Sequence, residues 1–442
     1  MKASRKRSIL AWPKGWRKSL WVIPSIGLFI KFIIISQIPG NAWLGADGEN
    51  YLKGLEFLIR DGFLSTESIL HYWPAGYPLL MWVLGFVTPQ LTLPIMAVLQ
   101  SLLFAFATAF FTQKVNGTSL KKYSVAISLF LTFNPTLSLN TIAIGYELIS
   151  ASIFLLVIGL FIDLSQQQHR RILSWQIITS GSLFSLNNFV QPRFSLSALL
   201  FFSFIAITLY PRKLAPVVVS IGMVISLLLP SILIFRNSQA NGFSSVSTNF
   251  GVAMQLGAGD NATGGYVPTF PGVDCPETSG NAAEVDRAKV SCVVKWYLKN
   301  PTEIVRLSIN KSIFFWSPWF GPLANGSMAR NPWIKLNPFY DVATKTQEGY
   351  DLVYGNIGKL LSGIWMVGSL ALLIIGLLQL WKMGDLPKRL SVLLGLIVIA
   401  NWLVSLGTLG DHRQRVPILS LIIVIQVIGL MSLKKKKSQR RK

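Results

Sequence analysis

The chain has 442 residues, of which 51% are hydrophobic and only 13% are charged, and its mean hydropathy is +0.50. This composition indicates a multi-pass membrane protein. The formal net charge of +23 would suggest a nucleic-acid partner in a soluble chain, but loop Lys and Arg residues that orient spans and contact anionic lipid head groups account for most of it. Nucleic acid is therefore excluded as a partner.

Clusters of basic residues between the apolar segments predict the topology. More than half of the 41 Lys and Arg residues fall in six clusters, which the positive-inside rule places in cytoplasmic loops. The clusters are Lys2 to Lys18, Lys114 to Lys122, Arg170-Arg171, Arg212-Lys213, Lys382 to Arg389 and Lys434 to Lys442. Both termini are therefore expected in the cytoplasm, with a bacterial plasma membrane as the expected location.

The apolar segments predict about ten transmembrane helices, with one or two either way, since a span needs about 17 to 25 mostly apolar residues. They lie near Leu20–Ile38, Tyr77–Thr112, Tyr123–Ile142, Leu148–Leu164, Ile172–Val190, Phe194–Tyr210, Leu214–Phe235, Gly355–Leu380, Leu390–Leu409 and Val416–Leu433. The first is expected as an uncleaved span, because no small-residue cleavage site follows it. The second is too long for one crossing, so Pro89 and Pro94 predict a short helix followed by a full span. The predicted fold class is an all-α polytopic membrane protein.

Two segments, 39–76 and 236–354, are too polar to cross the membrane and are expected on its outer side. Loops of this length are usually functional or disordered. The second has a helical pattern from Ala282 to Lys311 and then an aromatic stretch that suits the membrane interface, so we expect a partial lid on the lipid surface. The expected division is a transmembrane catalytic module 1–235 that includes the first outer loop, an outer-loop region 236–354 with interfacial helices, and C-terminal transmembrane helices with a basic cytoplasmic tail, 355–442.

Cys275 and Cys292 are the only two cysteines, and both lie in the second outer loop. In an oxidising outer compartment they favour a disulfide, and the alternative is two unpaired thiols. No further Cys or nearby His completes a zinc site. The sequon Asn261-Ala-Thr263 would also lie outside and could be glycosylated in a eukaryote.

The first outer loop carries two candidate catalytic acids, Asp47 and Glu49. Asp47 follows the first span and precedes a predicted amphipathic helix, so its carboxylate is expected at the membrane surface. Apolar surroundings raise the pKa of a carboxylate and make it a better acceptor for a hydroxyl proton. The alternative is that Asp47 only caps the helix that follows it. Glu49 cannot share the helical face of Asp47.

His71 and Tyr77 close the same loop and are candidate substrate contacts. His71 could bind a metal ion or a phosphate, and the alternative is an ordinary solvated histidine. Interfacial tyrosines such as Tyr77 are also frequent for structural reasons alone. Glu147 and Arg193 are further candidates for substrate binding, because each lies at the rim of an apolar stretch where a charge is costly unless it is paired or binds a ligand. The alternative is an ion pair between Glu147 and Arg193.

The densest polar cluster between two spans is Gly410-Asp411-His412-Arg413-Gln-Arg415. Under the predicted topology it faces outward, against the positive-inside trend. Two arginines there favour an anionic partner such as a lipid phosphate or diphosphate. His412, Arg413 and Arg415 are thus candidate substrate-binding residues. The alternative is an interfacial turn whose arginines reach lipid head groups.

Together these motifs resemble a known family. The motifs are the acid Asp47 in the first outer loop, Tyr77-Pro-Leu-Leu, Asn134-Pro followed by Glu147, Pro192-Arg193, and His412-Arg-x-Arg-x-Pro before the last span. They are similar to those of the polyprenyl-phosphate-sugar-dependent glycosyltransferases of the GT-C fold, related to protein mannosyltransferases (family 39-like). That family has an adjacent acidic pair in the first loop, whereas Gly48 separates Asp47 from Glu49 here.

The resemblance implies an inverting glycosyltransferase that acts at the outer membrane face. Asp47 would take the proton of an acceptor hydroxyl, and Arg193, Arg413 and Arg415 would hold the donor phosphate. Inverting transfer does need one base and positive charge at the departing phosphate. The implied partners are a polyprenyl-phosphate-linked sugar, an acceptor that is a glycan, a lipid or a protein, and membrane lipids. No cofactor is required by the residues, although a divalent metal ion stays open, with Glu147 or His71 as conceivable ligands.

Two other classes of function stay open. A transporter or flippase of a lipid-linked sugar would also use outer arginines and an apolar groove. Transporters, however, often have repeated halves and charged or broken helices near the bilayer midplane, which this sequence does not show. A polymerase or ligase of surface polysaccharide would share the donor chemistry and place its key residues in the second outer loop, where Arg306 and Arg330 stand.

Overall fold

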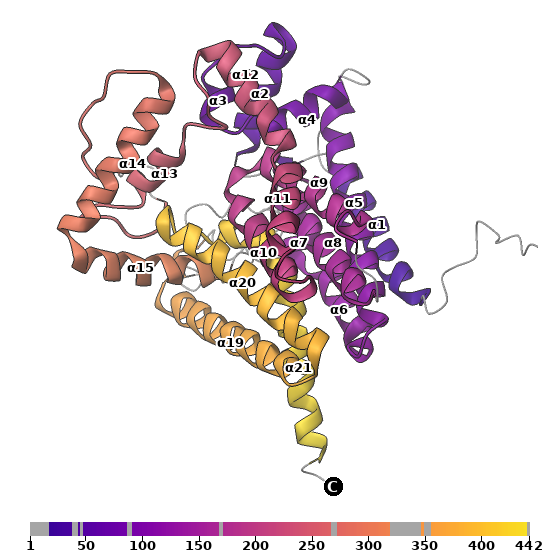
Figure 1. Ribbon diagram of the computed structural model, residues 1–442. Coiled ribbons are helices and arrows are strands. Elements are labelled where there is room, and N and C mark those ends of the chain that lie inside the picture. The colour runs from indigo at the N-terminus through magenta and orange to yellow at the C-terminus, as the bar shows by residue number, and fades with distance from the viewer. Residues whose placement is uncertain are drawn as a thin grey trace, which may run out of the picture.

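The computed structural model describes residues 17–37, 43–44, 47–85, 91–167, 171–266, 272–318, 346–348 and 355–439. This part of the chain is almost wholly helical (Figure 1). The helices are α1 (Ser19–Gln37), α2 (Gly48–Asp61), α3 (Ile69–Tyr72), α4 (Gly76–Gly85), α5 (Thr92–Asn116), α6 (Ser124–Phe133), α7 (Pro135–Asn140), α8 (Glu147–Ser165), α9 (Trp175–Val190), α10 (Ser195–Leu209), α11 (Ala215–Ser226), α12 (Leu228–Asn241), α13 (Phe250–Leu256), α14 (Ala282–Lys299), α15 (Pro301–Trp316), α19 (Asn356–Trp381), α20 (Asp385–Gly407) and α21 (Val416–Gln439). Short 3₁₀ helices are η3 (Lys121–Tyr123), η4 (Pro192–Phe194) and η6 (His412–Arg415).

Within the described residues, seven helical segments are long and apolar enough to cross a membrane, or eight when the bent pair α11 and α12 counts as one span. Two of the ten predicted spans are helical but shorter than 18 residues. Pro135 divides the segment predicted as Tyr123–Ile142 into α6 and α7, and α9 ends at Val190 before Pro192. Proline lacks an N–H and disfavours a helical conformation in the residue before it, which explains both breaks.

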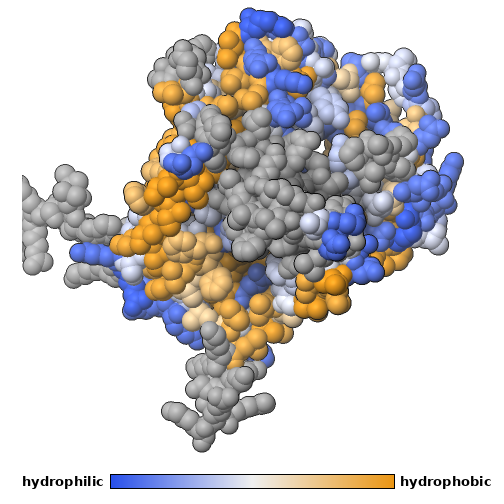
Figure 2. Space-filling view, turned by 180° about the vertical axis from the view of Figure 1, so that it is seen from behind, coloured by the Kyte–Doolittle hydropathy of each residue, from blue (hydrophilic) through white to orange (hydrophobic). Residues whose placement is uncertain are grey.

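The surface of these helices is suited to lipid. Large apolar side chains are exposed along α1 and α19, among them Phe29 at 64% and Leu360 at 64%. Figure 2 shows apolar residues gathered over a broad area of the opposite face, with hydrophilic residues over much of its top. Such an extended apolar surface is stable in a bilayer and not in water. The protein is an integral membrane protein, as its composition predicts.

α8 forms the centre of the helical bundle. Its residues from Leu148 to Ile162 are all buried, and it packs between α5, α9 and α21. α21 also crosses α19 closely, because Gly376 faces the backbone of Ile425 and Gly429 faces the backbone of Leu372. Small residues of this kind let two helix backbones approach each other in a membrane.

The described part of the segment predicted as the first outer loop folds into the helices α2 and α3, which lie near α12 (Figure 1). Arg236 of α12 joins the two. The Arg236 side chain is fully buried and donates hydrogen bonds to the backbone carbonyls of Phe63, Ser65 and Leu70. A buried guanidinium needs such partners to offset its desolvation. Arg236 thereby fixes the end of the first outer loop on a membrane helix.

In its described part, the segment predicted as the second outer loop contains α13, α14 and α15. The helical pattern predicted from Ala282 to Lys311 is two helices rather than one, because Pro301 follows the non-helical Asn300. The second of them also continues through Trp316, into the stretch predicted as a separate aromatic segment. The predicted disulfide between Cys275 and Cys292 is confirmed and ties the preceding loop to α14.

Candidate active site

A two-residue parallel strand pair sets the position of the two central acids. β1 (Trp43–Leu44) pairs with β2 (Ala143–Ile144), with Leu44 opposite Ile144. Asp47 follows Leu44 by three residues and Glu147 follows Ile144 by three residues. The strand pairing therefore brings the start of α2 and the start of α8 together in matching register.

Arg413 joins these two acids. Its Nη2 lies 2.6 Å from Asp47 Oδ2 and its Nε lies 2.6 Å from Glu147 Oε1. The side chains of Asp47 and Arg413 are both 9% exposed. Ion pairs and hydrogen bonds to ionised groups are strongest where water is excluded. One guanidinium thus holds two carboxylates in a nearly dry site.

Asp47 stands at the N-cap position of α2, but its side chain makes no capping hydrogen bond. The carboxylate points to Arg413 instead. An N-cap residue that only started the helix would accept from backbone N–H groups of the first turn. The alternative that Asp47 is only a helix cap is therefore wrong for its side chain.

The ion pair expected between Glu147 and Arg193 as an alternative is also wrong, because Glu147 pairs with Arg413. Arg193 donates from Nη2 to the backbone carbonyl of Gln414 over 3.4 Å. Its guanidinium carbon lies 5.4 Å from the ring centre of Tyr146, next to Glu147 in the chain. Arg193 therefore contacts the turn that carries Arg413 through the Gln414 carbonyl, and it contacts the start of α8 through the Tyr146 ring.

Tyr51, which the sequence did not single out, lies beside the acid pair. Tyr51 is one helical turn after Asp47, and its ring centre lies 4.9 Å from that of Tyr77. Burial first, and then the nearby Asp47 carboxylate, raises the pKa of Tyr51 well above its usual value, so this phenol stays neutral. Tyr77 itself is fully buried behind Tyr51 and donates its hydroxyl to Gln100. The spacing of four residues between Asp47 and Tyr51 was the available signal for the missed tyrosine.

Asp411 starts the turn that carries the arginines. Its Oδ1 accepts a hydrogen bond from the backbone N–H of Arg413 over 2.8 Å, and burial raises its pKa to about 6. His412 is 1% exposed, and its Nδ1 lies 3.8 Å from Asp411 Oδ1. His412 therefore points into the protein beside Asp411.

Arg415 faces a different space from Arg413. Its Nη2 donates to the carbonyl of Ser317 over 2.6 Å, and its guanidinium lies 5.5 Å from the ring centre of Trp365. Its Nη1 is buried and has no hydrogen-bond partner in the described part of the chain. An unpartnered donor on a buried charge is costly, and such a group is often completed by a ligand.

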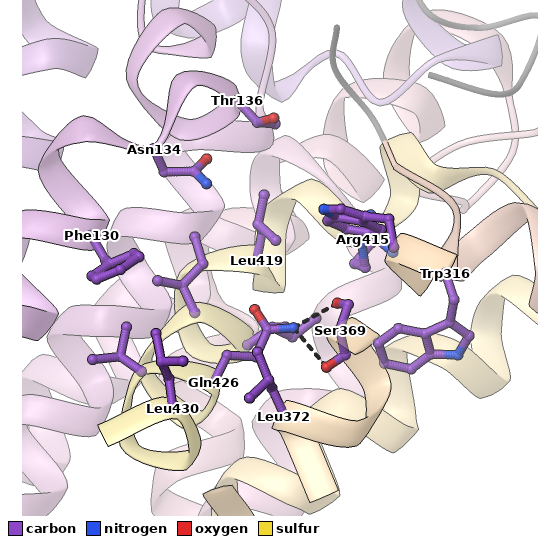
Figure 3. Close-up of a pocket in the computed structure, with 14 residues that line it drawn as sticks. Phe130, Asn134, Thr136, Trp316, Ser369, Leu372, Arg415, Leu419, Gln426 and Leu430 are labelled. Carbon is purple, nitrogen blue, oxygen red and sulfur yellow. Dashed lines mark hydrogen bonds between the residues drawn. The ribbon is translucent and has the colours of Figure 1, made fainter. Parts of the chain in front are cut away.

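The space next to Arg415 is a mostly apolar cavity of about 210 Å³. It lies along α21 between α6, α7 and α19, and Figure 3 shows Arg415 and Trp316 on one side of it, Asn134 and Thr136 at one end, and Leu430 at the other. The hydroxyl of Thr136, another lining residue, is also buried and has no partner in the part of the chain that the structure describes. The apolar wall on α21 runs from Leu419 to Leu430, about 16 Å at the rise of an α-helix.

Two predicted site residues lie outside this cluster. Glu49 is exposed on the first turn of α2. His71 bonds through Nδ1 to Thr248 over 3.2 Å and contacts the ring of Phe243, so it packs between the two outer loops. Among the described residues, no three His, Cys, Asp or Glu side chains form a group that could hold a metal ion. The conceivable metal ligands Glu147 and His71 thus have separate partners.

Comparisons with known proteins show the fold. No protein-family model matches the chain, and no curated protein matches its sequence. The oligosaccharyltransferase of Archaeoglobus fulgidus in its apo form is similar, with a TM-score of 0.52 and 14% identity over 97% of this chain and 52% of that one. The same archaeon's AglB oligosaccharyltransferase, in complex with an inhibitory peptide and a dolichol-phosphate, has a TM-score of 0.50 and 11% identity over 96% and 51%.

The chain therefore spans about half the length of these two proteins. They are oligosaccharyltransferases of the GT-C fold, so the predicted all-α polytopic architecture of GT-C type is confirmed. These two similarities do not show the predicted relation to protein mannosyltransferases.

Proposed function

We propose that the protein is an inverting glycosyltransferase that moves a sugar from a polyprenyl-phosphate donor to an acceptor hydroxyl at the outer membrane face. The observation that carries the proposal is a buried acid pair on Arg413, two residues before Arg415, which lines an apolar cavity and whose Nη1 has no partner among the described residues. The fold likeness adds support, because one of the similar proteins is in complex with a dolichol-phosphate.

The donor phosphate would bind at Arg415. Arg415 and Thr136 both line the cavity, and among the described residues neither Arg415 Nη1 nor the Thr136 hydroxyl has a hydrogen-bond partner. A phosphate oxygen accepts hydrogen bonds from both group types, and the bond to Arg is charge-assisted. The apolar wall from Leu419 to Leu430 would take the first part of the prenyl chain. A charged head and an apolar tail match these two ends of the cavity.

Asp47 would act as the base. The acceptor oxygen attacks the anomeric carbon, its proton passes to the Asp47 carboxylate, and the bond from the anomeric carbon to the phosphate oxygen breaks. The polyprenyl phosphate leaves with the bonding electrons, and the sugar inverts at the anomeric carbon. General-base catalysis and stabilisation of the leaving phosphate are the two contributions that this reaction needs.

Arg413 would hold the base in position. In the structure it pairs with both Asp47 and Glu147, at 2.6 Å each. Charge-assisted hydrogen bonds of this kind are strong and directional, so the Asp47 carboxylate has a fixed place at the start of α2.

The proposed catalytic unit includes both ends of the chain. Asp47, Glu147 and Arg193 belong to the region 1–235, whereas Arg413 and Arg415 belong to the region 355–442. The catalytic module predicted as 1–235 alone therefore needs the last span. We keep a bacterial plasma membrane with cytoplasmic termini as the proposed setting, and a glycan, a lipid or a protein as the proposed acceptor.

The late-loop polymerase alternative is not supported by Arg306. Its guanidinium is paired with Glu303 and bonds to the carbonyls of Ala262 and Asp260, which leaves it in a structural role. Arg330, the other residue on which that alternative depends, lies outside the described residues.

The test is transfer by the purified protein in lipid vesicles that contain radiolabelled polyprenyl-phosphate sugars and a panel of acceptors. We expect a labelled acceptor product with one of the donors. Movement of the labelled lipid across the bilayer without any glycosyl product would instead identify a transporter.

A further inference from the structure

Helix α15 of the second outer loop contacts the turn that carries Arg413 and Arg415. Lys311, in the middle of α15, is completely buried. Its Nζ donates to the backbone carbonyl of Leu406 over 2.9 Å and to the Tyr297 hydroxyl over 3.2 Å. Lys311 thus connects the second outer loop to the end of α20.

The Leu406 carbonyl is one of the last four carbonyls of α20, which have no partner within the helix. A cation at this end of a helix is favourable, because the helix dipole places partial negative charge there. Lys311 therefore caps α20 just before the turn begins. Burial lowers the Lys311 pKa to about 8, because the charged form loses its hydration.

The end of α15 also contacts Arg415, the last residue of the turn. The carbonyl of Ser317, which ends α15, accepts the hydrogen bond from Arg415 Nη2. Between these two points, the indole N–H of Trp402 donates to Ser312 over 3.2 Å. Helix α15 is thus attached to the residue just before the segment 407–415 and, through its C-cap Ser317, to the last residue of that segment.

The segment 407–415 is also packed closely against the backbone of the second outer loop. The N–H of Gly410 donates to the carbonyl of Gly264 over 2.8 Å, and a side chain at Gly410 would collide with the backbone of Lys311. Gly257 is likewise packed on the carbonyl of Thr408. Backbone contacts therefore hold the turn at Thr408 and at Gly410, next to Lys311.

We propose that Lys311 is a positioning residue for the donor site, which holds the 407–415 turn so that Arg413 and Arg415 face their partners. The proposal rests on the proposed function, because it assumes that the turn carries a donor site. The contacts that support it do not involve Asp47 or Glu147. An apolar side chain would fill the same volume without the desolvation cost of an ammonium, yet it could not bind the Leu406 carbonyl.

The test compares Lys311→Met with Lys299→Met, which removes an exposed lysine of the same outer loop. The first readout is hydrogen exchange of the purified proteins. We expect the amides of Gly410 and Arg413 to exchange at least tenfold faster in Lys311→Met and at the wild-type rate in Lys299→Met. Equal exchange in all three proteins overturns the proposal.

The second readout is the affinity for a polyprenyl phosphate without sugar. We expect a loss of about tenfold in Lys311→Met at unchanged monodispersity, which a general loss of folded protein would not give. A wild-type protein that binds no polyprenyl phosphate contradicts the proposed function, whereas wild-type affinity in Lys311→Met contradicts the positioning role. If Lys311→Met does not fold, Lys311→Gln keeps one donor for Leu406, and it should lose about threefold in affinity; no loss would count against the role.

Discussion

The carboxylate of Asp47 and the guanidinium of Arg413 form a buried ion pair at 2.6 Å although 366 positions separate them in the chain. The contact joins the first outer loop to the turn before the last span. An acid and an arginine with this separation must be brought together by the packing of the helices between them. The pair gives the most direct test of the proposed chemistry.

Replacing Asp47 by Asn keeps its size and removes the base. We expect turnover to fall by roughly 100- to 10,000-fold, the range that general-base catalysis supplies. Binding of the donor should survive, because Arg415 and the cavity are unchanged. The measurement is the initial rate of glycosyl transfer together with donor affinity.

The matched control is Glu56→Gln, which removes an exposed carboxylate from the same helix and should leave turnover unchanged. Near-normal turnover in Asp47→Asn would show that Asp47 is not the base.

Replacing Arg415 by Gln should weaken donor binding more than it lowers turnover. A hydrogen bond to a charged group contributes about 1.5 to 3 kcal/mol, so the KM for the donor should rise by roughly 10- to 100-fold. Initial rates over a range of donor concentrations measure this change. Arg212→Gln, which removes an exposed arginine of a predicted cytoplasmic loop, is the control. An unchanged donor KM in Arg415→Gln would mean that the phosphate binds elsewhere.

Asp411 should make the free energy of unfolding depend on pH in the direction opposite to that of a carboxylate whose pKa is lowered by an ion pair. Its pKa is raised from 3.8 to about 6 in the folded protein, so the folded state favours the protonated form. Its contribution to stability is therefore complete below about pH 4 and is lost as the pH rises through 6. Asp411→Asn keeps an oxygen for the Arg413 amide without a charge.

We expect Asp411→Asn to gain stability relative to wild type between pH 4 and pH 7, by an amount on the order of 2 to 3 kcal/mol. Thermal unfolding of both proteins in detergent across this range measures the difference. Unfolding curves that keep a constant separation at every pH would contradict the role of Asp411 burial.

The Cys275–Cys292 disulfide should stabilise the second outer loop. The cysteines are 17 residues apart, and a crosslink of this loop size contributes about 3 kcal/mol in the chain-entropy model. Replacing both by Ser should therefore speed limited proteolysis between residues 272 and 299. Peptide mapping of the digest over time measures the rate, with wild type under reducing conditions as a second comparison. Equal cleavage rates for the oxidised wild type and the double variant would show that the disulfide does not order the loop.

Much of the architecture could be predicted from local sequence. The apolar segments predicted the membrane helices, because each span is stabilised by lipid largely independently of its neighbours. Pro89 and Pro94 predicted the division between α4 and α5, and the two cysteines predicted their own pairing. The same rules did not place the break at Pro135, which divides the segment predicted as one span into α6 and α7.

The sequence also placed the candidate residues at the ends of spans, since charges are excluded from the apolar segments by their desolvation cost. It did not determine which charges pair. Glu147 had Arg193 as an equally plausible partner by position, and Asp47 had a helix-capping role that its neighbours supported. Only the tertiary structure decided both cases, because the β1–β2 pairing aligns the two acids and the packing of α21 on α8 brings Arg413 between them. The partner of a buried charge depends on the three-dimensional arrangement of helices that are distant in sequence, and that arrangement is set by their packing rather than by any local pattern.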